Sequence, residues 1–145
     1  MDFQEVVQKV KEKSFEQGNL ILNKNENINE IVKKENVPNK YGVYVIYSVK
    51  NGQKEVIYIG KSGTLCSNGF RKQGIKKRLT MKQRKMSRKE FFQKVISEND
   101  YDSLYFEWYV TYENGKGILP FLMESELLAA YFYTYRKLPK LNRCI

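Results

Sequence analysis

The sequence predicts a single α/β domain in which a small antiparallel sheet of three strands is flanked by helices. Its length of 145 residues suits one domain of ordinary size. Apolar residues follow a helical period near the N-terminus, form two extended runs after residue 41, and return to a helical period before the C-terminus. Because we find no internal repeat or linker, all of these elements are expected to share one core.

Residues 1–40 are expected to form a helical extension packed on the domain formed by residues 41–145. Apolar residues recur at helical spacing from Phe3 to Val10. A second short helix is expected from Ile28 to Lys34, ahead of Pro38. Three roles stay open for this extension: a dimer interface, a nucleic-acid contact, and a lid over the sheet.

From residue 41 the pattern predicts a β-hairpin, with the runs YGVYVIYSV and QKEVIYIG on either side of Asn51-Gly52. The length of its loop decides which side chains share a face. A two-residue loop at Asn51-Gly52 pairs Tyr44 with Ile59, which puts Tyr44 and Tyr58 on opposite faces. A three-residue loop with a bulge, or a bulge elsewhere, brings both phenols to one face.

Four further segments complete the predicted domain. A loop from Lys61 to Gly69 leads to a basic helix at 71–89, and a second helix carries Phe91 and Ile96. A third strand is expected at 104–112, and the last helix at 120–137.

The net charge of +10 is concentrated in one segment of the chain. Residues 71–89 hold ten basic residues and no acidic one, whereas the rest of the chain is balanced. A solvated helix face normally mixes charges of both signs, so this segment favours a polyanionic partner, and nucleic acid above all. Apart from Arg78, which is considered below, the candidate phosphate contacts are Arg71, Lys72, Lys76, Lys77, Lys82, Arg84, Lys85, Arg88 and Lys89.

The chain contains no histidine, which excludes histidine-based metal centres, Ser-His-Asp triads and imidazole proton transfer. Catalysis would have to use tyrosine, lysine, arginine or carboxylate. Cys66 and Cys144 lack metal-site spacing, so free thiols in a reducing cytoplasm are expected. Because no apolar leader or membrane-length apolar run occurs, neither secretion nor membrane insertion is expected.

Five short motifs occur in a fixed order along the chain. Gly42-Val43-Tyr44 and Tyr58-Ile59-Gly60 lie on adjacent predicted strands, and Gly74–Leu79 opens a predicted helix. Glu124–Leu128 and Leu138–Asn142 follow. Over residues 42–142 the chain resembles the GIY-YIG nuclease family. The resemblance implies hydrolysis of phosphodiester bonds with one divalent ion, Mg²⁺ or Mn²⁺, on double-stranded or branched DNA.

Two arginines are available to bind the scissile phosphate, Arg71 and Arg78. At about 100° per residue, Arg78 lies on the same helix face as Ile75, Leu79 and Met86, the stripe expected to dock on the sheet. Its flanking residues also match the family motif, so Arg78 is assigned to the phosphate.

The carboxylate is chosen by a similar argument. Glu124 and Glu126 point about 200° apart on a helix, so only one of them faces the sheet. Glu124 shares its face with Leu127 and Tyr131, where a carboxylate is costly unless it is paired or metal-bound. Glu124 is therefore the predicted metal ligand and is counted among the catalytic residues, and Glu126 is assigned to the helix dipole.

The resemblance also gives roles to the two tyrosines and a lysine. We expect Tyr58 to orient or deprotonate the attacking water and Tyr44 to position it, with these roles exchangeable. Lys61 would lower a phenol pKa or hold a phosphate, although an ordinary loop lysine is an equally open interpretation. The structural residues of the motif are Gly42, Gly60 and Asn142.

Two other functions are consistent with the composition. A non-catalytic nucleic-acid module would hold phosphates with the basic helix and stack bases on aromatic residues of 104–112. The strand alternation instead places Phe106 and Trp108 on one buried face, with Tyr105 and Tyr109 on the other. The basic segment would alternatively dock an acidic protein. A nuclease that cuts both strands with one site per chain would need a homodimer.

Overall fold

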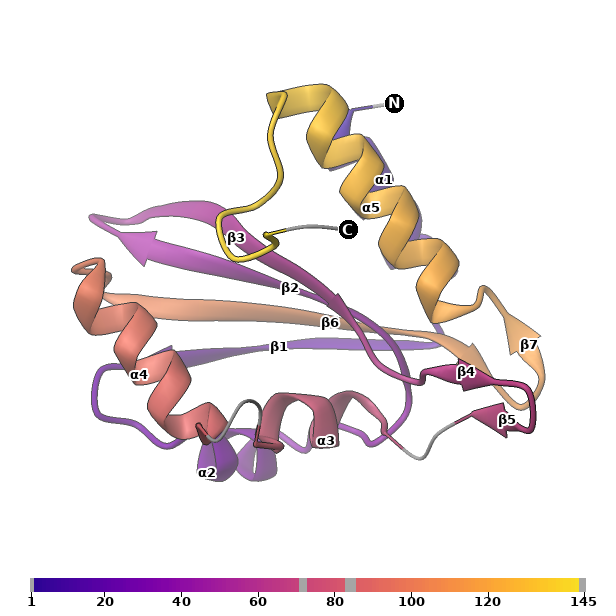
Figure 1. The fold of residues 1–145 in the computed structure, drawn as a ribbon, viewed down its shortest axis with the longest axis horizontal. Helices are drawn as coiled ribbons and strands as arrows, with labels where there is room; N and C mark the ends of the chain where they lie inside the picture. Colours follow the sequence, from indigo (N-terminus) through magenta and orange to yellow (C-terminus); the bar gives the residue numbers. More distant parts are fainter. Residues whose placement is uncertain (1, 71–72, 83–85, 144–145) are drawn as a thin grey trace.

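The computed structural model describes residues 2–70, 73–82 and 86–143, which form an antiparallel sheet with helices on both faces (Figure 1). The strands are β1 (Glu16–Asn23), β2 (Tyr41–Lys50), β3 (Gln53–Lys61), β4 (Leu65–Cys66), β5 (Gly69–Phe70), β6 (Ser103–Glu113) and β7 (Lys116–Gly117). The helices are α1 (Phe3–Lys13), α2 (Ile28–Lys34), α3 (Ile75–Thr80), α4 (Arg88–Glu98) and α5 (Pro120–Tyr135).

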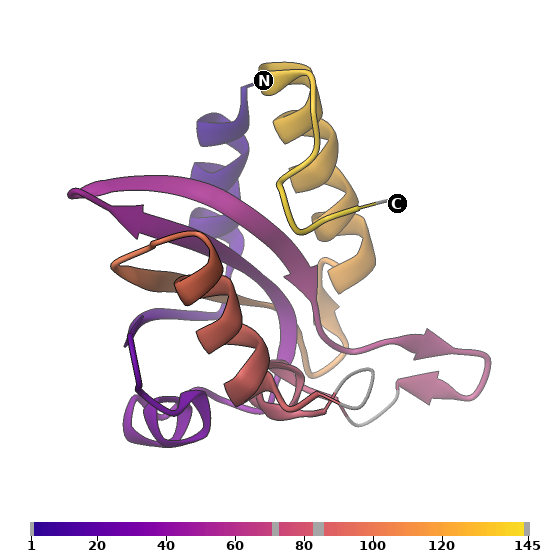
Figure 2. The same cartoon turned by 60° about the vertical axis from the view of Figure 1, so that its left-hand side comes forward.

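The main sheet has the strand order β1-β6-β2-β3, with β7 paired to β6, while β4 and β5 form a separate small hairpin. Helices α1 and α5 lie side by side on one face, and α2, α3 and α4 cover the other (Figure 2). Alternate residues of β2 serve the two cores: Val43 and Val45 face α1 and α5, whereas Tyr44 and Ile46 face the other three helices. This two-sided burial explains why the strand is apolar along most of its length.

The predicted α/β class is confirmed, and the three predicted strands are present as β2, β3 and β6. The sheet is larger than the three strands predicted, however, because β1 and β7 also pair with β6. Residues 1–40 are therefore not purely helical. Strand β1 was missed because it is an edge strand with only Leu20 and Leu22 buried. Its Gly18 is required, since a Cβ there would lie 2.4 Å from the Trp108 ring.

The hairpin has the two-residue loop, and a bulge elsewhere brings the two phenols together. Asn51 and Gly52 both have positive φ, 52° and 76°, as in a type I′ turn. The register shifts farther along the hairpin, where Ile57 is the extra residue of β3. Tyr44 consequently pairs with Gly60, and Tyr58 lies on the same face of the sheet as Tyr44. The alternative of a three-residue loop is wrong.

The basic segment is not the single helix that was predicted. Helix α3 ends at Thr80, and α4 begins only at Arg88 after Ser87, whose side chain accepts a hydrogen bond from the Glu90 N–H. Like charges spaced four residues apart disfavour a longer helix. Met86 consequently does not continue the apolar stripe of α3.

The chain after α5 returns to the free edge of β3. The Asn142 side chain accepts a hydrogen bond from the Ile59 N–H and donates one to the Ile59 carbonyl, both at 2.9 Å. The Leu141 N–H donates to the Ile57 carbonyl at 2.8 Å. Asn142 thus satisfies the outward-facing backbone groups of Ile59 on the edge strand that carries Tyr58, which is a structural role.

The sequence predicted free thiols and no membrane insertion, and the structure tests part of each prediction. Cys66 is a free thiol, and Cys144 lies outside the described residues. In the described ranges, no helix combines the length and the apolar character needed to cross a membrane.

Candidate active site

The two tyrosines of the paired strands meet above a glycine. The rings of Tyr44 and Tyr58 have centroids 6.0 Å apart. A Cβ on Gly60 would lie 2.6 Å from the Tyr44 hydroxyl and 2.6 Å from the Tyr58 ring, so both rings use the space that a side chain would fill. Gly42 is equally constrained, because a Cβ there would lie 1.8 Å from the Tyr109 carbonyl oxygen. Both glycines are therefore required by close packing.

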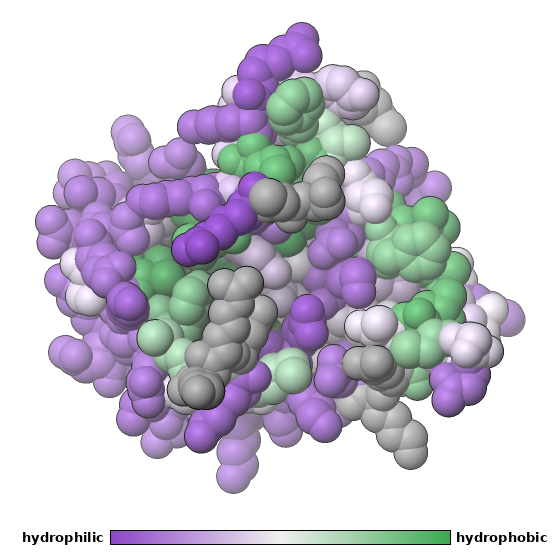
Figure 3. All heavy atoms as spheres, viewed as in Figure 1, coloured by the Kyte–Doolittle hydropathy of each residue, from purple (hydrophilic) through white to green (hydrophobic). Residues whose placement is uncertain are grey.

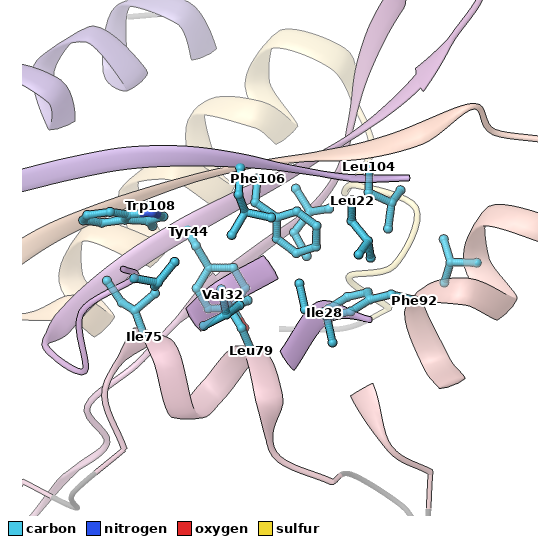
Figure 4. Packing of buried hydrophobic residues seen from close by; sticks show 14 of the residues in the cluster. Leu22, Ile28, Val32, Tyr44, Ile75, Leu79, Phe92, Leu104, Phe106 and Trp108 are labelled. Carbon is cyan, nitrogen blue, oxygen red and sulfur yellow. The ribbon is translucent and has the colours of Figure 1, made fainter. Parts of the chain in front are cut away.

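The two phenols have different environments. Tyr44 is only 2% exposed and points from the sheet toward Ile75 and Leu79 of α3 (Figure 4), whereas Tyr58 is half-buried. Burial raises the pKa of the Tyr44 phenol well above its ordinary value, and Tyr58 raises it further. The nearby positive charges of Arg78 and Arg88 offset only part of this rise. Tyr44 therefore stays protonated at physiological pH.

Arg78 is held beside Tyr44 by the packing of α3. Ile75 and Leu79 of this short helix are 0% and 1% exposed, which fixes α3 on the sheet. Arg78 is half-buried and lies close enough to Tyr44 for its charge to lower the pKa of that phenol, and its Nε is buried with no hydrogen-bond partner among the described residues. This N–H can therefore donate to an acceptor such as water or a phosphate oxygen.

Glu124 reaches the same place from the opposite face of the sheet. It lies near the start of α5, and in Figure 1 the end of β3 passes between this part of α5 and α3. Burial raises the pKa of the Glu124 carboxyl, while the positive charges of Lys61 and Arg78 partly oppose that rise. The carboxylate, Lys61 and Arg78 are therefore electrostatic neighbours around the edge of β3.

Glu126 has a different environment from Glu124, in agreement with the helical phase argument. Its carboxylate forms an ion pair at 2.6 Å with Lys9 of α1. This contact joins the two helices of one layer and does not involve the site. The partner of Glu126 is thus a lysine of α1, where the helix dipole had been expected.

Arg88 is nearer to the site than sequence reasoning placed it. As the first residue of α4, it lies with its guanidinium 5.4 Å and 5.8 Å from the ring centroids of Phe91 and Phe92. Its charge acts on the Tyr44 phenol. The sequence feature that could have indicated this position is Ser87, a strong helix-capping residue. It allows α4 to begin beside α3, which brings Arg88 close to Tyr44.

The other basic residues form the surroundings of the site. Lys76 and Lys77 on α3, Lys82 after it, and Lys89 on α4 are exposed to solvent. Four candidate phosphate contacts lie outside the described residues, and these are Arg71, Lys72, Arg84 and Lys85.

The divalent ion implied by the family resemblance can be tested against the donors present. In the described part of the chain, no group of three or more acidic or cysteine side chains is placed to hold a metal ion. The Glu124 carboxylate is nevertheless half-buried beside the phosphate-binding candidates. Mg²⁺ keeps several waters and is commonly held by one or two carboxylates and substrate phosphates. This donor set therefore fits Mg²⁺ or Mn²⁺ and does not fit a structural zinc ion.

Comparison with known proteins finds no family model, no curated protein and no solved structure that matches this chain significantly. The functional interpretation therefore rests on the geometry of the site and on its short motifs.

Proposed function

We propose that the protein is an endonuclease of the GIY-YIG type, which hydrolyses phosphodiester bonds in DNA with one divalent ion, Mg²⁺ or Mn²⁺. One observation carries the proposal. The side chains of Tyr44, Tyr58, Arg78 and Glu124 come from four separate elements, and they gather at the end of β3 with Lys61. Packing alone does not require a carboxylate and a guanidinium at this edge, whereas phosphoryl transfer uses both.

In this proposal Arg78 binds the scissile phosphate. Its planar fork donates to two phosphoryl oxygens and stabilises the negative charge that develops on them in the transition state. The anchoring of α3 holds the guanidinium close to Tyr44. Lys61 would add a second positive charge beside the scissile phosphate.

Glu124 would hold the divalent ion, together with a phosphate oxygen of the substrate and water. When bound, the ion neutralises charge on the phosphate and lowers the pKa of a coordinated water. Tyr58 is partly exposed and is therefore available to contact the attacking water, whereas the buried Tyr44 is not. The site thus separates the two tyrosines, with Tyr58 acting on water and Tyr44 acting through Arg78.

A test of the proposed function compares supercoiled plasmid incubated with the protein and Mg²⁺ against the same reaction with EDTA. We expect nicked and linear DNA only with the metal. Binding that weakens with salt but yields no product would favour the non-catalytic nucleic-acid module. That module would lack most of its stacking platform, because Phe106, Trp108 and Tyr109 are 0%, 5% and 2% exposed. Failure to bind DNA would contradict both functions.

The tyrosine assignment predicts unequal effects of removing each hydroxyl. Tyr58→Phe should lower kcat by about a hundredfold or more, the usual range for a group that transfers or orients a proton. Tyr44→Phe should lower it by only about tenfold, because it loosens Arg78 without touching water. Single-turnover cleavage at saturating protein measures both rates, with circular dichroism melting as the control for folding. A larger loss for Tyr44→Phe than for Tyr58→Phe would reverse the roles.

A further inference from the structure

Helix α5 is apolar on its solvent face as well as on its buried face. Met123, Leu127 and Tyr131 are buried against the sheet and α1. On the opposite side, large apolar side chains lie at both ends and small residues lie between them. The large ones are Phe121, Leu122, Phe132 and Tyr133, which are 41%, 51%, 44% and 67% exposed, and the small ones are the exposed Ser125 and Ala129.

A surface helix normally carries charged residues on its solvent face, and a helix that is apolar all round is normally covered. Figure 3, in the view of Figure 1, shows hydrophobic atoms over the region where α5 lies. The four large side chains expose roughly 400 Å² in total, given about 200 Å² for a fully exposed side chain of this size. A standard interface covers about 800 Å² per partner, so this face is large enough to form the apolar centre of one.

The sizes of the side chains along the face follow the same order in both directions. With position 127 as the centre, Phe121 corresponds to Tyr133, and Leu122 to Phe132. Ser125 corresponds to Ala129 in the same way. A two-fold axis through this centre would bring large side chains of one copy against large ones of the other and small against small, which suits an isologous interface.

The sizes of the side chains suit two crossing helices. Helices that cross are closest at the crossing point and diverge toward their ends. Ser125 and Ala129 would allow close approach at the centre, and the large side chains would fill the widening gap on either side. We propose that the solvent face of α5 binds the same face of a second copy of this chain, forming a two-fold symmetric homodimer.

The distribution of charge is compatible with this pairing despite the net charge of +10. The exposed lysines of the basic segment lie on and beside α3 and α4, which cover the opposite face of the sheet from α5. Two copies joined through α5 therefore keep their most basic surfaces apart, which limits electrostatic repulsion between them.

The dimer would also relate the two candidate active sites. Glu124 lies on α5, next to the proposed interface but turned toward the end of β3. Pairing of the two helices would hold two sites in a fixed relation, and this consequence rests on the proposed endonuclease activity. Because the exposed lysines lie on the faces turned away from the interface, each site would act on its own segment of DNA.

Sedimentation equilibrium of the full chain in the micromolar range tests the dimer without reference to activity. We expect a mass twice the 17.2 kDa of one chain. Ala129→Arg should weaken association at least about a hundredfold, because it places two guanidinium groups in a desolvated centre. Gln8→Arg adds the same charge to the exposed face of α1 in the same layer and should leave the dimer intact. A monomeric wild type, or equal dimerisation by both variants, would overturn the proposal.

Cross-linking tests the register of the two helices. In a background with Cys66→Ser and Cys144→Ser, the double variant Ser125→Cys/Ala129→Cys should oxidise to a covalent dimer, since each position faces the other across the two-fold axis. Either single substitution should cross-link far more slowly. Equally fast cross-linking by Ser125→Cys alone would contradict this register.

Plasmid cleavage separates the dimer from its functional consequence. Ala129→Arg should still cleave DNA at the wild-type rate, because the substitution lies outside the candidate active site and each site acts on its own segment of DNA. A wild-type dimer that shows no metal-dependent cleavage would refute the nuclease and leave the dimer established. Loss of cleavage by a folded, monomeric Ala129→Arg variant would refute the independence of the two sites.

Discussion

Replacement of Glu124 by glutamine is expected to abolish metal-dependent cleavage and, at the same time, to stabilise the metal-free protein. Cleavage should fall at least about a thousandfold, because the variant loses the ligand that would hold the divalent ion. No remaining group replaces the positive charge of that ion beside the phosphate. The stability effect follows from burial, which raises the pKa of the Glu124 carboxyl in the folded protein. A neutral side chain of the same shape removes the free-energy penalty of a partly buried negative charge.

The sign of this effect depends on pH. Above the raised pKa, the folded wild type carries an unfavourable charge that Glu124→Gln lacks, so the variant should melt at a higher temperature in EDTA. As the pH falls through that pKa, the wild-type carboxyl of the folded protein becomes protonated and the difference should shrink, and it should vanish below the ordinary pKa of the carboxyl in the unfolded chain. Thermal melts at neutral and acidic pH, with plasmid cleavage run in parallel, measure both effects.

Glu126→Gln is the matched control for this experiment. It removes a charge from the same helix and breaks the ion pair with Lys9, in which both side chains are about one-third exposed. The free energy of unfolding should fall by no more than about 1 kcal/mol, as is usual for surface ion pairs. Its rate of cleavage should match that of the wild type. Full activity of Glu124→Gln, or inactivity of Glu126→Gln, would show that the wrong carboxylate was chosen.

The elements that sequence analysis predicted well are those whose pattern is local. Helices α1, α2 and α4 follow an apolar helical period that their own residues define. Strand β1 has no comparable local pattern. Its pairing partner β6 lies about 90 residues away, as shown by the register of Leu20 with Phe106, and its glycine and asparagine residues are typical of turns. An edge strand of this kind is defined by its tertiary partner.

The bulge in β3 shows a second limit of sequence analysis. Counting back from a two-residue Asn51-Gly52 loop predicts that Tyr44 and Tyr58 lie on opposite faces. The structure has this two-residue loop, yet the two tyrosines share one face. The extra residue Ile57 reverses the outcome. Its side chain packs into the same core as Tyr44 and Ile46, so the bulge places an additional apolar side chain in that core, a gain that depends on the helices opposite.

Sequence analysis named the residue types of the candidate site, but it did not predict that one tyrosine is buried and the other partly exposed. The motifs name Tyr44 and Tyr58 as a pair, and nothing in either tripeptide indicates which phenol is exposed. The difference arises from α3, whose residues Ile75 and Leu79 pack near Tyr44 (Figure 4) and leave Tyr58 closer to solvent. Arg88 could not be placed because its position depends on where the basic segment interrupts its helix.

Arg78→Lys is the second substitution with a large expected effect, and it separates geometry from charge. The variant retains a positive charge beside Tyr44 but loses the planar fork, so one ammonium group replaces two parallel donors. We expect kcat to fall by about a thousandfold, the order found when a preorganised contact to a transition-state oxygen is removed. Affinity for duplex DNA and its dependence on salt should change little, because the number of charges is the same.

Lys77→Ala provides the opposite pattern on the same helix, since Lys77 is exposed and adjacent to Arg78. Loss of a phosphate contact there should weaken binding to all sequences and lower the salt slope by about one, with kcat at saturating protein unchanged. Cleavage rates at saturation and binding isotherms at several salt concentrations distinguish the two variants. If Arg78→Lys lowered affinity in the manner of Lys77→Ala and kept its kcat, Arg78 would be one more backbone contact. Another group would then have to stabilise the transition-state charge, and Arg88, whose charge also acts on Tyr44, is a candidate.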